Sequence, residues 1–271
     1  MKNLFDIKNK VVVVTGSTGV LAGNVAQYLA QQGAQVVFIG RNEEKLQKAV
    51  QQAQSVNKDC FYCVANVLDK NALQAAYDKI MAKCGRIDAL VNGAGGNMPG
   101  AVIPPDKSVF DLDFEQWRAV IDLNLGGTML PILVFGKAFE KQKEGVIVNF
   151  SSMAAEQALT RVLGYSNAKS GINNLTRWLA VEFAKKTGEK VRVNAVAPGF
   201  FISEQNRALL TNPDGSYTER GNQVINKTPF GRFGKCDEIN GTVHYLISEA
   251  SAFVTGTIMA VDGGFSAFTG V

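Results

Sequence analysis

Residues 11–24 of the chain read VVVVTGSTGVLAGN. Four consecutive valines are typical of a strand that is buried on both faces of a sheet, and the glycines at 16, 19 and 23 predict a tight turn after it. We expect a helix to begin near Val20 and to be capped at its C-terminal end by Gly33. A buried strand, a glycine-rich turn and a helix N-terminus together favour a loop that holds phosphate groups.

The glycine spacing in this loop is irregular for a dinucleotide site. Such loops use one glycine for the turn, a second for close approach of the pyrophosphate and a third for packing of helix on strand. Gly16 fits the first role, and we expect Gly19 to fill the second while Val20 turns into the core. Ala22 would then pack where the third glycine usually stands. A glycine-rich turn without a ligand is the alternative at this point.

Seven apolar runs rich in β-branched residues recur along the chain, at 10–16, 34–40, 60–66, 87–93, 145–151, 191–199 and 256–264. Continuous runs of this kind are typical of parallel strands that are covered by helices on both faces. Amphipathic segments of helical length lie between them, and one begins at Asn42 as an N-cap. The pattern predicts an α/β protein with a three-layer, doubly wound Rossmann fold and a seven-stranded parallel sheet.

Length and composition agree with one domain over residues 1–271. Hydrophobic residues make up 46% and charged residues 19% of the 271 positions, which is typical of a globular protein. Three long connections, at 94–112, 151–163 and about 198–236, each follow a strand. We expect them at the carboxyl edge of the sheet, where ligands bind in open α/β folds. The third contains two helix-like segments and predicts a substrate lid at about 198–236.

Charge and cysteine content exclude several classes of function. The net charge of +4 is dispersed, so we expect no nucleic-acid partner. No apolar run approaches the roughly 18 residues of a membrane span and the N-terminus has no apolar segment, which predicts a cytoplasmic protein. Cys60 and Cys63 have the spacing of half a zinc site or of a redox pair. A second ligand pair is missing and the only histidine, His244, lies far away, so we expect structural thiols and no metal.

Four polar residues stand where chemistry would be placed. Tyr165 and Lys169 are four residues apart, which puts them on one face of a helix. An ammonium group beside a phenol favours the phenolate, so we expect the pKa of Tyr165 below its usual value of about 10. Ser152 follows a predicted central strand, and Asn124 interrupts an apolar helical segment. Taken alone, the tyrosine and lysine could be two solvated helix residues.

In this order and spacing, the motifs resemble those of the classical short-chain dehydrogenase/reductase (SDR) family. The resemblance covers residues 8–264 and rests on the loop at 15–23, NGAG at 92–95, Asn124, Ser152, Tyr165-x-x-x-Lys169, APGFFIS at 197–203 and VDGG at 261–264. It implies that Tyr165 acts as general acid or base, that Ser152 orients the substrate oxygen, that Lys169 holds the nicotinamide ribose and that Asn124 positions a water molecule.

The resemblance also implies where the dinucleotide is bound. The implied contacts come from Gly16, Thr18, Gly19, Val20, Leu21, Arg41, Asn42, Asn66, Val67, Asn92, Ala94, Gly95, Tyr165, Lys169, Pro198, Gly199, Phe201 and Ser203. Three positions depart from the family pattern, namely Asn66 for an aspartate, Gly93 for an asparagine and Ser203 for a threonine.

The end of the second predicted strand bears on the choice of cofactor. Enzymes that prefer NAD usually place a carboxylate there, whereas an arginine accommodates the 2′-phosphate of NADP. This chain has Gly40 followed by Arg41, which favours NADP(H) and leaves NAD(H) as the alternative, with Arg41 then stacked on adenine.

Basic and amide residues in the long loops predict an anionic, polyhydroxylated small-molecule substrate, most simply a sugar acid. The candidate substrate contacts are Asn97, Ser152, Met153, Gln157, Arg161 and Arg207. Within the family, GVLAG, NGAGGNMPGA, APGFFISEQNRALL, TPFGRFGK and VDGGFSAFTGV resemble the D-mannonate oxidoreductase (fructuronate reductase) branch, which implies interconversion of D-fructuronate and D-mannonate. Branches that reduce 5-ketogluconate or carrier-bound 3-ketones are alternatives, as is a dinucleotide-binding protein without catalysis. The family also implies a homotetramer.

Overall fold

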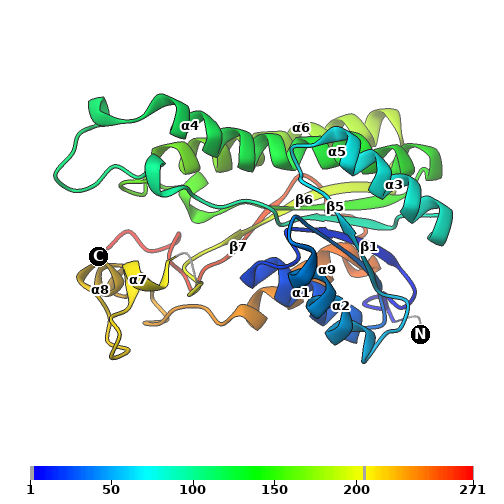
Figure 1. Ribbon diagram of the computed structural model, residues 1–271, viewed down its shortest axis with the longest axis horizontal. Helices are drawn as coiled ribbons and strands as arrows, with labels where there is room; N and C mark the ends of the chain where they lie inside the picture. Colours follow the sequence, from blue (N-terminus) through cyan, green and yellow to red (C-terminus); the bar gives the residue numbers. More distant parts are fainter. Residues whose placement is uncertain (1–2, 204–205, 271) are drawn as a thin grey trace.

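A single parallel sheet with helices on both faces organises the chain (Figure 1). The computed structural model describes residues 3–203 and 206–270. The strands follow the order β3-β2-β1-β4-β5-β6-β7, and every neighbouring pair is parallel. The predicted three-layer α/β fold with seven parallel strands is therefore confirmed.

All seven predicted strands form within the apolar runs that predicted them. Their bounds are β1 Val11–Thr15, β2 Gln35–Gly40, β3 Phe61–Val64, β4 Ala89–Asn92, β5 Gly145–Phe150, β6 Val191–Pro198 and β7 Ile258–Val261. The helices are α1 Val20–Gln31, α2 Glu43–Gln54, α3 Lys70–Cys84, α4 Phe114–Ile121, α5 Gly127–Gln142, α6 Leu163–Lys186, α7 Arg207–Leu210, α8 Glu219–Lys227 and α9 Asn240–Ile247.

The valines of β1 show how the sheet is buried. Val12 and Val14 pack into the layer that contains α1, α2 and α9. Val11 and Val13 point to the opposite face and pack with α3, α5 and α6. Because successive side chains of a strand alternate between faces, an unbroken apolar run is what two covered faces require. In Figure 1 the first layer lies below the sheet and the second above it.

The helix boundaries that the sequence predicts are also found. α1 begins at Val20, and Gly33 follows its end with a φ of +87°, a conformation that costs glycine little. Oδ1 of Asn42 accepts a hydrogen bond from the backbone N–H of Lys45 at 2.9 Å, which caps α2 as expected.

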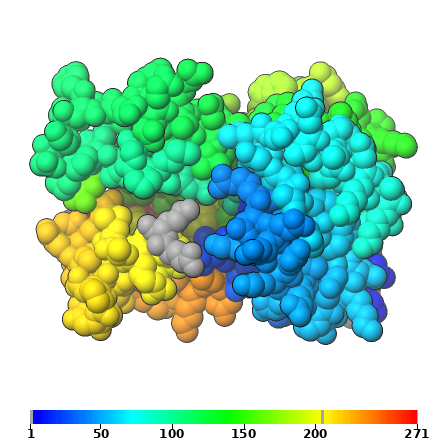
Figure 2. Space-filling model, in the orientation of Figure 1, coloured from blue at the N-terminus to red at the C-terminus, as the bar shows by residue number. Residues whose placement is uncertain are grey.

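The three long connections lie at the carboxyl ends of the strands. Figure 2 shows the segment around 94–126 facing the segment around 206–227 across a hollow. Within the latter, α7 and α8 pack on each other through Leu210, Val224 and Phe233. The predicted lid region therefore has a small apolar core of its own, apart from residues 204–205, which lie outside the described residues.

One helical run, Phe114–Gln142, is long and apolar enough to cross a membrane, with 29 residues and a mean hydropathy of 1.6 in its most apolar window. The expectation of no such run is wrong in this respect. Half of that window is buried, and Ile132, Phe135 and Phe139 of α5 pack against the sheet. We therefore interpret the run as a core helix of the fold.

Candidate active site

The N-terminus of α1 is open at the carboxyl edge of β1. Gly19 is its N-cap residue and provides no capping side chain, whereas Asn42 caps α2 and Asp69 caps α3. A Cβ added to Gly19 would have only the carbonyl oxygen of Gly16 nearby, at 3.2 Å. The uncapped N–H groups and the open space above Gly19 fit the pyrophosphate of a dinucleotide.

Gly16 makes the turn that brings this loop against the end of β4. Its φ is +65°, and an added Cβ would lie 2.7 Å from both Cα and N of Ala94. The backbone N–H of Ala94 also donates to Oγ1 of Thr15 at 3.3 Å. Gly16 therefore fits its predicted role on both conformation and close approach.

The expectation for Val20 is wrong, since 37% of this residue is exposed rather than buried in the core. Val20 is the first residue of α1, and the following residues supply the packing: Leu21 contacts the core and Ala22 is 4% exposed. A Cβ added to Gly93 would overlap the Cβ of Ala22. Ala22 and Gly93 are therefore complementary, because the Cβ of Ala22 occupies the space that a side chain at position 93 would need.

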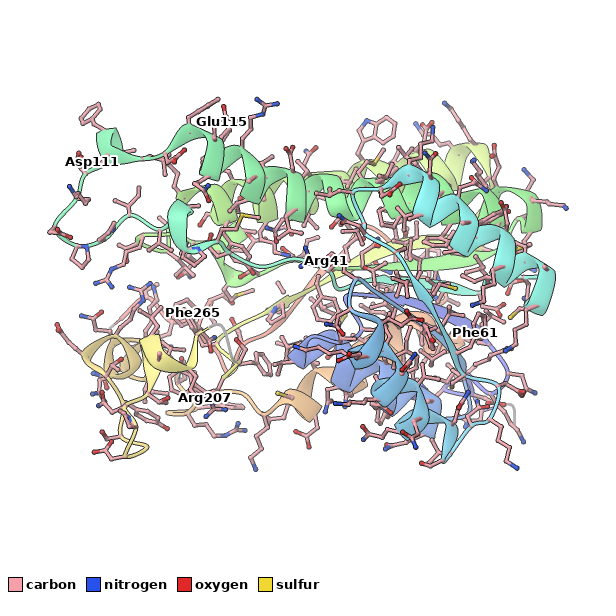
Figure 3. The ribbon with its side chains drawn as sticks, in the orientation of Figure 1. Arg41, Phe61, Asp111, Glu115, Arg207 and Phe265 are labelled. Carbon is pink, nitrogen blue, oxygen red and sulfur yellow. The ribbon has the colours of Figure 1, made fainter. Side chains whose placement is uncertain are left out.

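The end of β2 is open enough for a ribose and its substituent. A Cβ on Gly40 would lie 3.4 Å from Cδ2 of Leu46 and 3.5 Å from Oγ1 of Thr18, which are ordinary contacts. Arg41 follows with an exposed side chain, and Figure 3 shows it near the centre of the molecule. Oδ1 of Asn42 is occupied by the cap of α2.

The predicted contacts after β3 and β4 divide into exposed and buried positions. Asn66 is exposed and its Oδ1 accepts from the backbone N–H of Leu68, whereas Val67 is 6% exposed. Asn92 is 1% exposed, and its Nδ2 donates to Oδ1 of Asn149 at 3.0 Å. The Asn92 side chain therefore serves the interior between β4 and β5 rather than the surface of the edge.

Asn124 lies in a π-helical turn, Asp122–Gly126, between α4 and α5. Its Oδ1 accepts from the backbone N–H of Gly96 at 3.0 Å, and its Nδ2 donates to the Gly96 carbonyl oxygen at 2.7 Å. The same Nδ2 donates to the carbonyl oxygen of Val120 at 2.9 Å. A π turn widens a helix locally and is frequent at functional sites, and here it turns a fully buried amide toward the loop after β4.

Gly95 brings Asn124 and Lys169 together. An added Cβ there would lie 2.6 Å from Oδ1 of Asn124 and 3.4 Å from Nζ of Lys169. Nζ of Lys169 donates to the carbonyl oxygen of Phe150 at 2.7 Å and lies 5.4 Å from the centre of the Tyr165 ring. The Ser152 side chain lies near enough to the Tyr165 phenol to lower its pKa. The structure therefore places the four predicted catalytic residues in one cluster.

Burial controls the ionisation of this cluster. It raises the pKa of Tyr165 above 10.0, an effect that the hydrogen bond to Ser152 partly offsets. It also lowers the pKa of Lys169 from 10.5 to about 7. In both groups the charged form loses its hydration. The expectation that Lys169 holds the pKa of Tyr165 below 10 is therefore wrong for the protein chain by itself.

The predicted contacts after β6 lie where the segment predicted as a lid begins. Gly199 is needed there because an added Cβ would lie 2.7 Å from Cα of Asp262. Pro198 ends β6, Phe201 pairs with Gly234 in an isolated bridge, and the N–H of Ser203 donates to Oδ1 of Asn206 at 2.7 Å.

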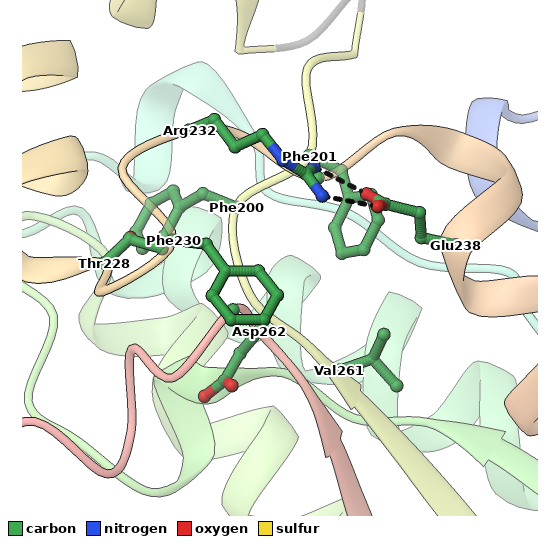
Figure 4. Close-up of a pocket in the computed structure, with 10 residues that line it drawn as sticks. Phe200, Phe201, Thr228, Phe230, Arg232, Glu238, Val261 and Asp262 are labelled. Carbon is green, nitrogen blue, oxygen red and sulfur yellow. Dashed lines mark hydrogen bonds and ion pairs between the residues drawn. The ribbon is translucent and has the colours of Figure 1, made fainter.

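A cavity of about 220 Å³ lies at the start of this segment, with the ion pair of Arg232 and Glu238 on one side (Figure 4). No residue of the predicted catalytic cluster lines it. The lining residues are Phe200, Phe201, Thr228, Phe230, Arg232, Gly234, Glu238, Val261, Asp262 and Gly263.

Two of the predicted substrate contacts, Met153 and Gln157, line a second cavity of about 580 Å³ and also contact the C-terminal segment. Met153 is 2% exposed and packs with Ala197 and Phe265. Nε2 of Gln157 donates to the carbonyl oxygen of Ser266 at 3.1 Å. Both side chains hold the C-terminal segment against the loop after β5. The sequence of the loop does not indicate these contacts, because Phe265 and Ser266 are more than 100 residues away.

Asn97 and the arginines have different surroundings. Oδ1 of Asn97 is buried and has no hydrogen-bond partner among the described residues, so it could accept from a substrate hydroxyl. Arg207 is exposed on α7, on the lower side of Figure 3. Arg161 is half-buried before α6, close to Arg220 of α8, which the sequence did not rank among the first substrate contacts.

The remaining cysteine and histidine residues have structural surroundings. Burial raises the pKa of Cys60, Cys63, Cys84 and Cys236, which keeps these thiols protonated. Nε2 of His244 lies 2.6 Å from the carbonyl oxygen of Phe5, and its Nδ1 lies 3.2 Å from the Tyr28 hydroxyl.

The model of a protein family described as enoyl-(acyl carrier protein) reductase matches residues 17–266. The chain belongs to the short-chain dehydrogenase/reductase family. This SDR chain is 41% identical to an uncharacterised oxidoreductase, UxuB, of Bacillus subtilis, over 98% of each chain. The protein is therefore an NAD(P)-dependent dehydrogenase/reductase.

Two solved SDR structures resemble this one over nearly their whole length. One is the crystal structure of a Haemophilus influenza protein provisionally assigned as a D-mannonate oxidoreductase, with NAD bound. It has a TM-score of 0.89 and 38% identity, covering 98% of each chain. The other, from Beutenbergia cavernae, is provisionally assigned as an NAD(P)-dependent gluconate 5-dehydrogenase and holds NADP at low occupancy. It has a TM-score of 0.86 and 28% identity, covering 98% of this chain and 100% of that one.

Proposed function

We propose that this SDR interconverts a ketone and a secondary alcohol on a sugar acid, with D-fructuronate and D-mannonate as the substrate pair. The observation that carries the proposal is the cluster of Asn124, Ser152, Tyr165 and Lys169 beside the open N-terminus of α1. When bound, the nicotinamide cofactor supplies or accepts the hydride.

Tyr165 is the proton donor to the substrate carbonyl oxygen in the reduction. Its raised pKa keeps the phenol protonated at neutral pH, which suits a general acid. Ser152 lies near the same phenol and lowers its pKa, so a carbonyl oxygen placed between the two hydroxyl groups would accept a bond from each. In the oxidation Tyr165 must first lose its proton and then accept one from the alcohol.

Lys169 and Asn124 support this pair from behind. Lys169 has a pKa of about 7, so near neutral pH it exchanges a proton readily and can donate to a ribose hydroxyl. Asn124 has its amide bonded to both backbone groups of Gly96, which fixes the loop that borders the nicotinamide side of the site. A water molecule on Asn124 would extend the path for protons toward the surface.

NADP(H) is the preferred cofactor in this proposal, and NAD(H) is accepted less well. The absence of a carboxylate at Gly40 and the exposed guanidinium of Arg41 support a site for the 2′-phosphate. The predicted nucleotide contacts from Gly16 to Ser203 stand as part of the proposal, with the Asn92 side chain as a support from within the sheet. NAD in the Haemophilus structure favours the alternative cofactor, and a comparison of kcat/KM for NADPH and NADH decides between them.

A sugar acid is supported by the basic residues of the lid and by the buried, unpartnered oxygen of Asn97. A 5-ketogluconate substrate is the second candidate because of the similarity to the Beutenbergia protein. A carrier-bound 3-ketone and a role in dinucleotide binding without catalysis are further alternatives. The complete catalytic cluster argues against the last of these.

The wider setting belongs to the same proposal: one cytoplasmic domain over residues 1–271, a lid at about 198–236 and a homotetramer. Exposed apolar side chains on α5 and α6 support contacts between subunits. Leu133 is 52%, Trp178 60% and Val181 55% exposed.

The decisive experiment follows NADPH and NADH oxidation with D-fructuronate, 5-ketogluconate, D-tagaturonate and an acetoacetyl thioester. We expect the highest kcat/KM with D-fructuronate and NADPH. Preference for the thioester, or no turnover of any sugar acid, would contradict the substrate proposal.

A further inference from the structure

The three long connections meet at two neighbouring residues, Thr160 and Arg161. Nη1 of Arg220 in α8 donates to Oγ1 of Thr160 at 3.2 Å, and its Nη2 donates to the Thr160 carbonyl oxygen at 3.3 Å. The backbone N–H of Ile103 donates to the carbonyl oxygen of Arg161 at 3.0 Å. The loop after β4, the loop before α6 and the lid are therefore linked at one point.

Two arginines belong to this point, because Arg220 is bonded to Thr160, the residue next to Arg161. Burial, and then the positive charge of Arg161, lower the pKa of Arg220. Neither arginine forms a salt bridge within residues 3–203 and 206–270, whereas Arg232 in the same lid region pairs with Glu238. Two half-buried cations side by side repel each other, and an anion placed between them removes that repulsion.

The backbone of Arg161 has an unusual conformation. Its φ is +74°, a region that a residue with a Cβ rarely adopts. Only Asn9 and Lys143 share a positive φ among the described non-glycine residues, and Lys143 does so as the C-cap of α5. Arg161 has no such helix end to explain it. Strained residues of this kind concentrate at sites that clamp a ligand.

Arg161 lies two residues before α6, which begins at Leu163, and four residues before Tyr165. Four residues span at most about 14 Å even when the chain is fully extended. A group bound by Arg161 would thus lie within reach of a small molecule that contacts the Tyr165 hydroxyl. Arg207, in contrast, is exposed on α7.

We propose that Arg161 and Arg220 together bind the carboxylate of the substrate, and that this anion draws α8 onto the loop before α6. The inference rests on the proposed sugar-acid function. It assigns the second cation of the carboxylate site to Arg220 in place of Arg207. The lid then closes only over a substrate that carries the anion, which makes the pair a determinant of specificity.

The test compares binding of D-gluconate with that of D-glucitol, which has the same hydroxylated chain without the carboxylate. Titration calorimetry is carried out on the wild type with saturating NADP⁺, and on Arg161→Asn and Arg220→Gln. Asparagine tolerates the left-handed conformation at 161, and glutamine keeps a donor for Thr160 at 220. Arg118→Gln, on the exposed face of α4, serves as the control for loss of an arginine.

We expect the wild type to bind D-gluconate better than D-glucitol, and each of the two variants to weaken D-gluconate binding by about ten- to hundredfold. The control should bind like the wild type. Protection of the lid from trypsin should increase with D-gluconate in the wild type and not in Arg220→Gln. Unchanged binding in both variants, or a loss in Arg207→Gln instead, would overturn the assignment, as would equal binding of the acid and the polyol.

Turnover separates this inference from the proposed function. If the arginines bind D-gluconate as expected and the wild type reduces no keto sugar acid, the proposed function is wrong and the carboxylate site stands. If sugar acids are reduced and both variants keep their KM, the carboxylate site is wrong and the proposed function stands.

Discussion

Ala22 of α1 fills the space that Gly93 leaves beside β4. A Cβ on Gly93 would overlap the Cβ of Ala22 and would lie 3.0 Å from the carbonyl oxygen of Thr15. Ala22 and Gly93 both depart from the family pattern, and the two departures belong together because a Cβ at one position excludes a Cβ at the other. The arrangement fixes how closely α1, whose N-terminus is the proposed phosphate site, approaches the loop after β4.

Gly93→Ala is therefore expected to destabilise the protein by about 1–3 kcal/mol through overpacking. It should also weaken NADPH binding, because α1 must shift. The double variant Ala22→Gly/Gly93→Ala removes the overlap and should recover most of the loss. Urea unfolding and NADPH titration of the two single variants and the double variant give the coupling free energy. Additive effects of the two substitutions would refute the shared space.

Gly95→Ala is expected to lower kcat by about a hundredfold. Its Cβ would push against Oδ1 of Asn124, which must then leave Gly96. Gly241→Ala is the matched control, because nothing lies within 4 Å of a Cβ there. Gly241 is the second residue of α9, where alanine is the better helix former, so this variant should stabilise the protein by up to about 1 kcal/mol and leave kcat unchanged. Equal rates for both variants would argue against a role of the Asn124 position.

Tyr165→Phe is expected to reduce turnover by about 10²- to 10⁴-fold while NADPH binding stays within a factor of about two. The ring and its packing are kept and only the hydroxyl is lost. Ser166→Ala is a suitable control, because the neighbouring Ser166 hydroxyl is buried without a partner in the described part of the chain. Steady-state rates and fluorescence titration of NADPH provide the two readouts. A phenylalanine variant with wild-type turnover would show that another group transfers the proton.

Stability should depend on pH through Lys169. Its pKa is about 7 in the folded protein and 10.5 when solvated. Between these values the unfolded chain binds more protons, so the free energy of unfolding rises with pH, by at most about 1.4 kcal/mol per pH unit from this group. Relative to Lys169→Met, the wild type should be least stable at or below pH 7 and should gain by pH 9. Urea unfolding of both proteins without cofactor measures this, and a pH-independent difference would count against a buried ammonium.

Gly40→Asp should reverse the cofactor preference. The added side chain has room beside Thr18 and Leu46, and its carboxylate would repel a 2′-phosphate while binding ribose hydroxyls. We expect kcat/KM with NADPH to fall by about a hundredfold and that with NADH to be maintained or to rise. Parallel assays with both cofactors measure the ratio. If NADPH is used as well as before, the 2′-phosphate does not lie beside Gly40.

The sequence was sufficient for the strands, the start of α1 and the cap of α2, because these depend on local patterns. Apolar runs bury themselves on both faces wherever they lie, and Asn42 caps the helix that it precedes. The grouping of Asn124, Ser152, Tyr165 and Lys169 was also predictable, since the motif order implied a common edge of the sheet.

Contacts between distant segments were not predictable in the same way. Val20 is exposed because Leu21 and Ala22 supply the packing, and the partner of Ala22 is 71 positions away. Met153 packs against Ala197 and Phe265, which are 44 and 112 positions away. The hydrogen bond from Arg220 to Thr160 joins residues 60 positions apart, so it depends on how the segment that contains α8 packs against the loop before α6. The pKa of Tyr165 is raised rather than lowered because the phenol is buried, and sequence spacing does not reveal burial.

The proposed lid buries Leu210, Val224 and Phe233 against one another, with the Tyr217 and Phe233 rings 5.1 Å apart. The sheet therefore does not need the lid for its own hydrophobic core. In descent from a common ancestor, such a segment can diverge, or be exchanged between relatives, while the dinucleotide half keeps folding as before. New substrates would be acquired at this segment first, and a chimera that carries a relative's residues 206–236 would inherit that relative's choice of ketone.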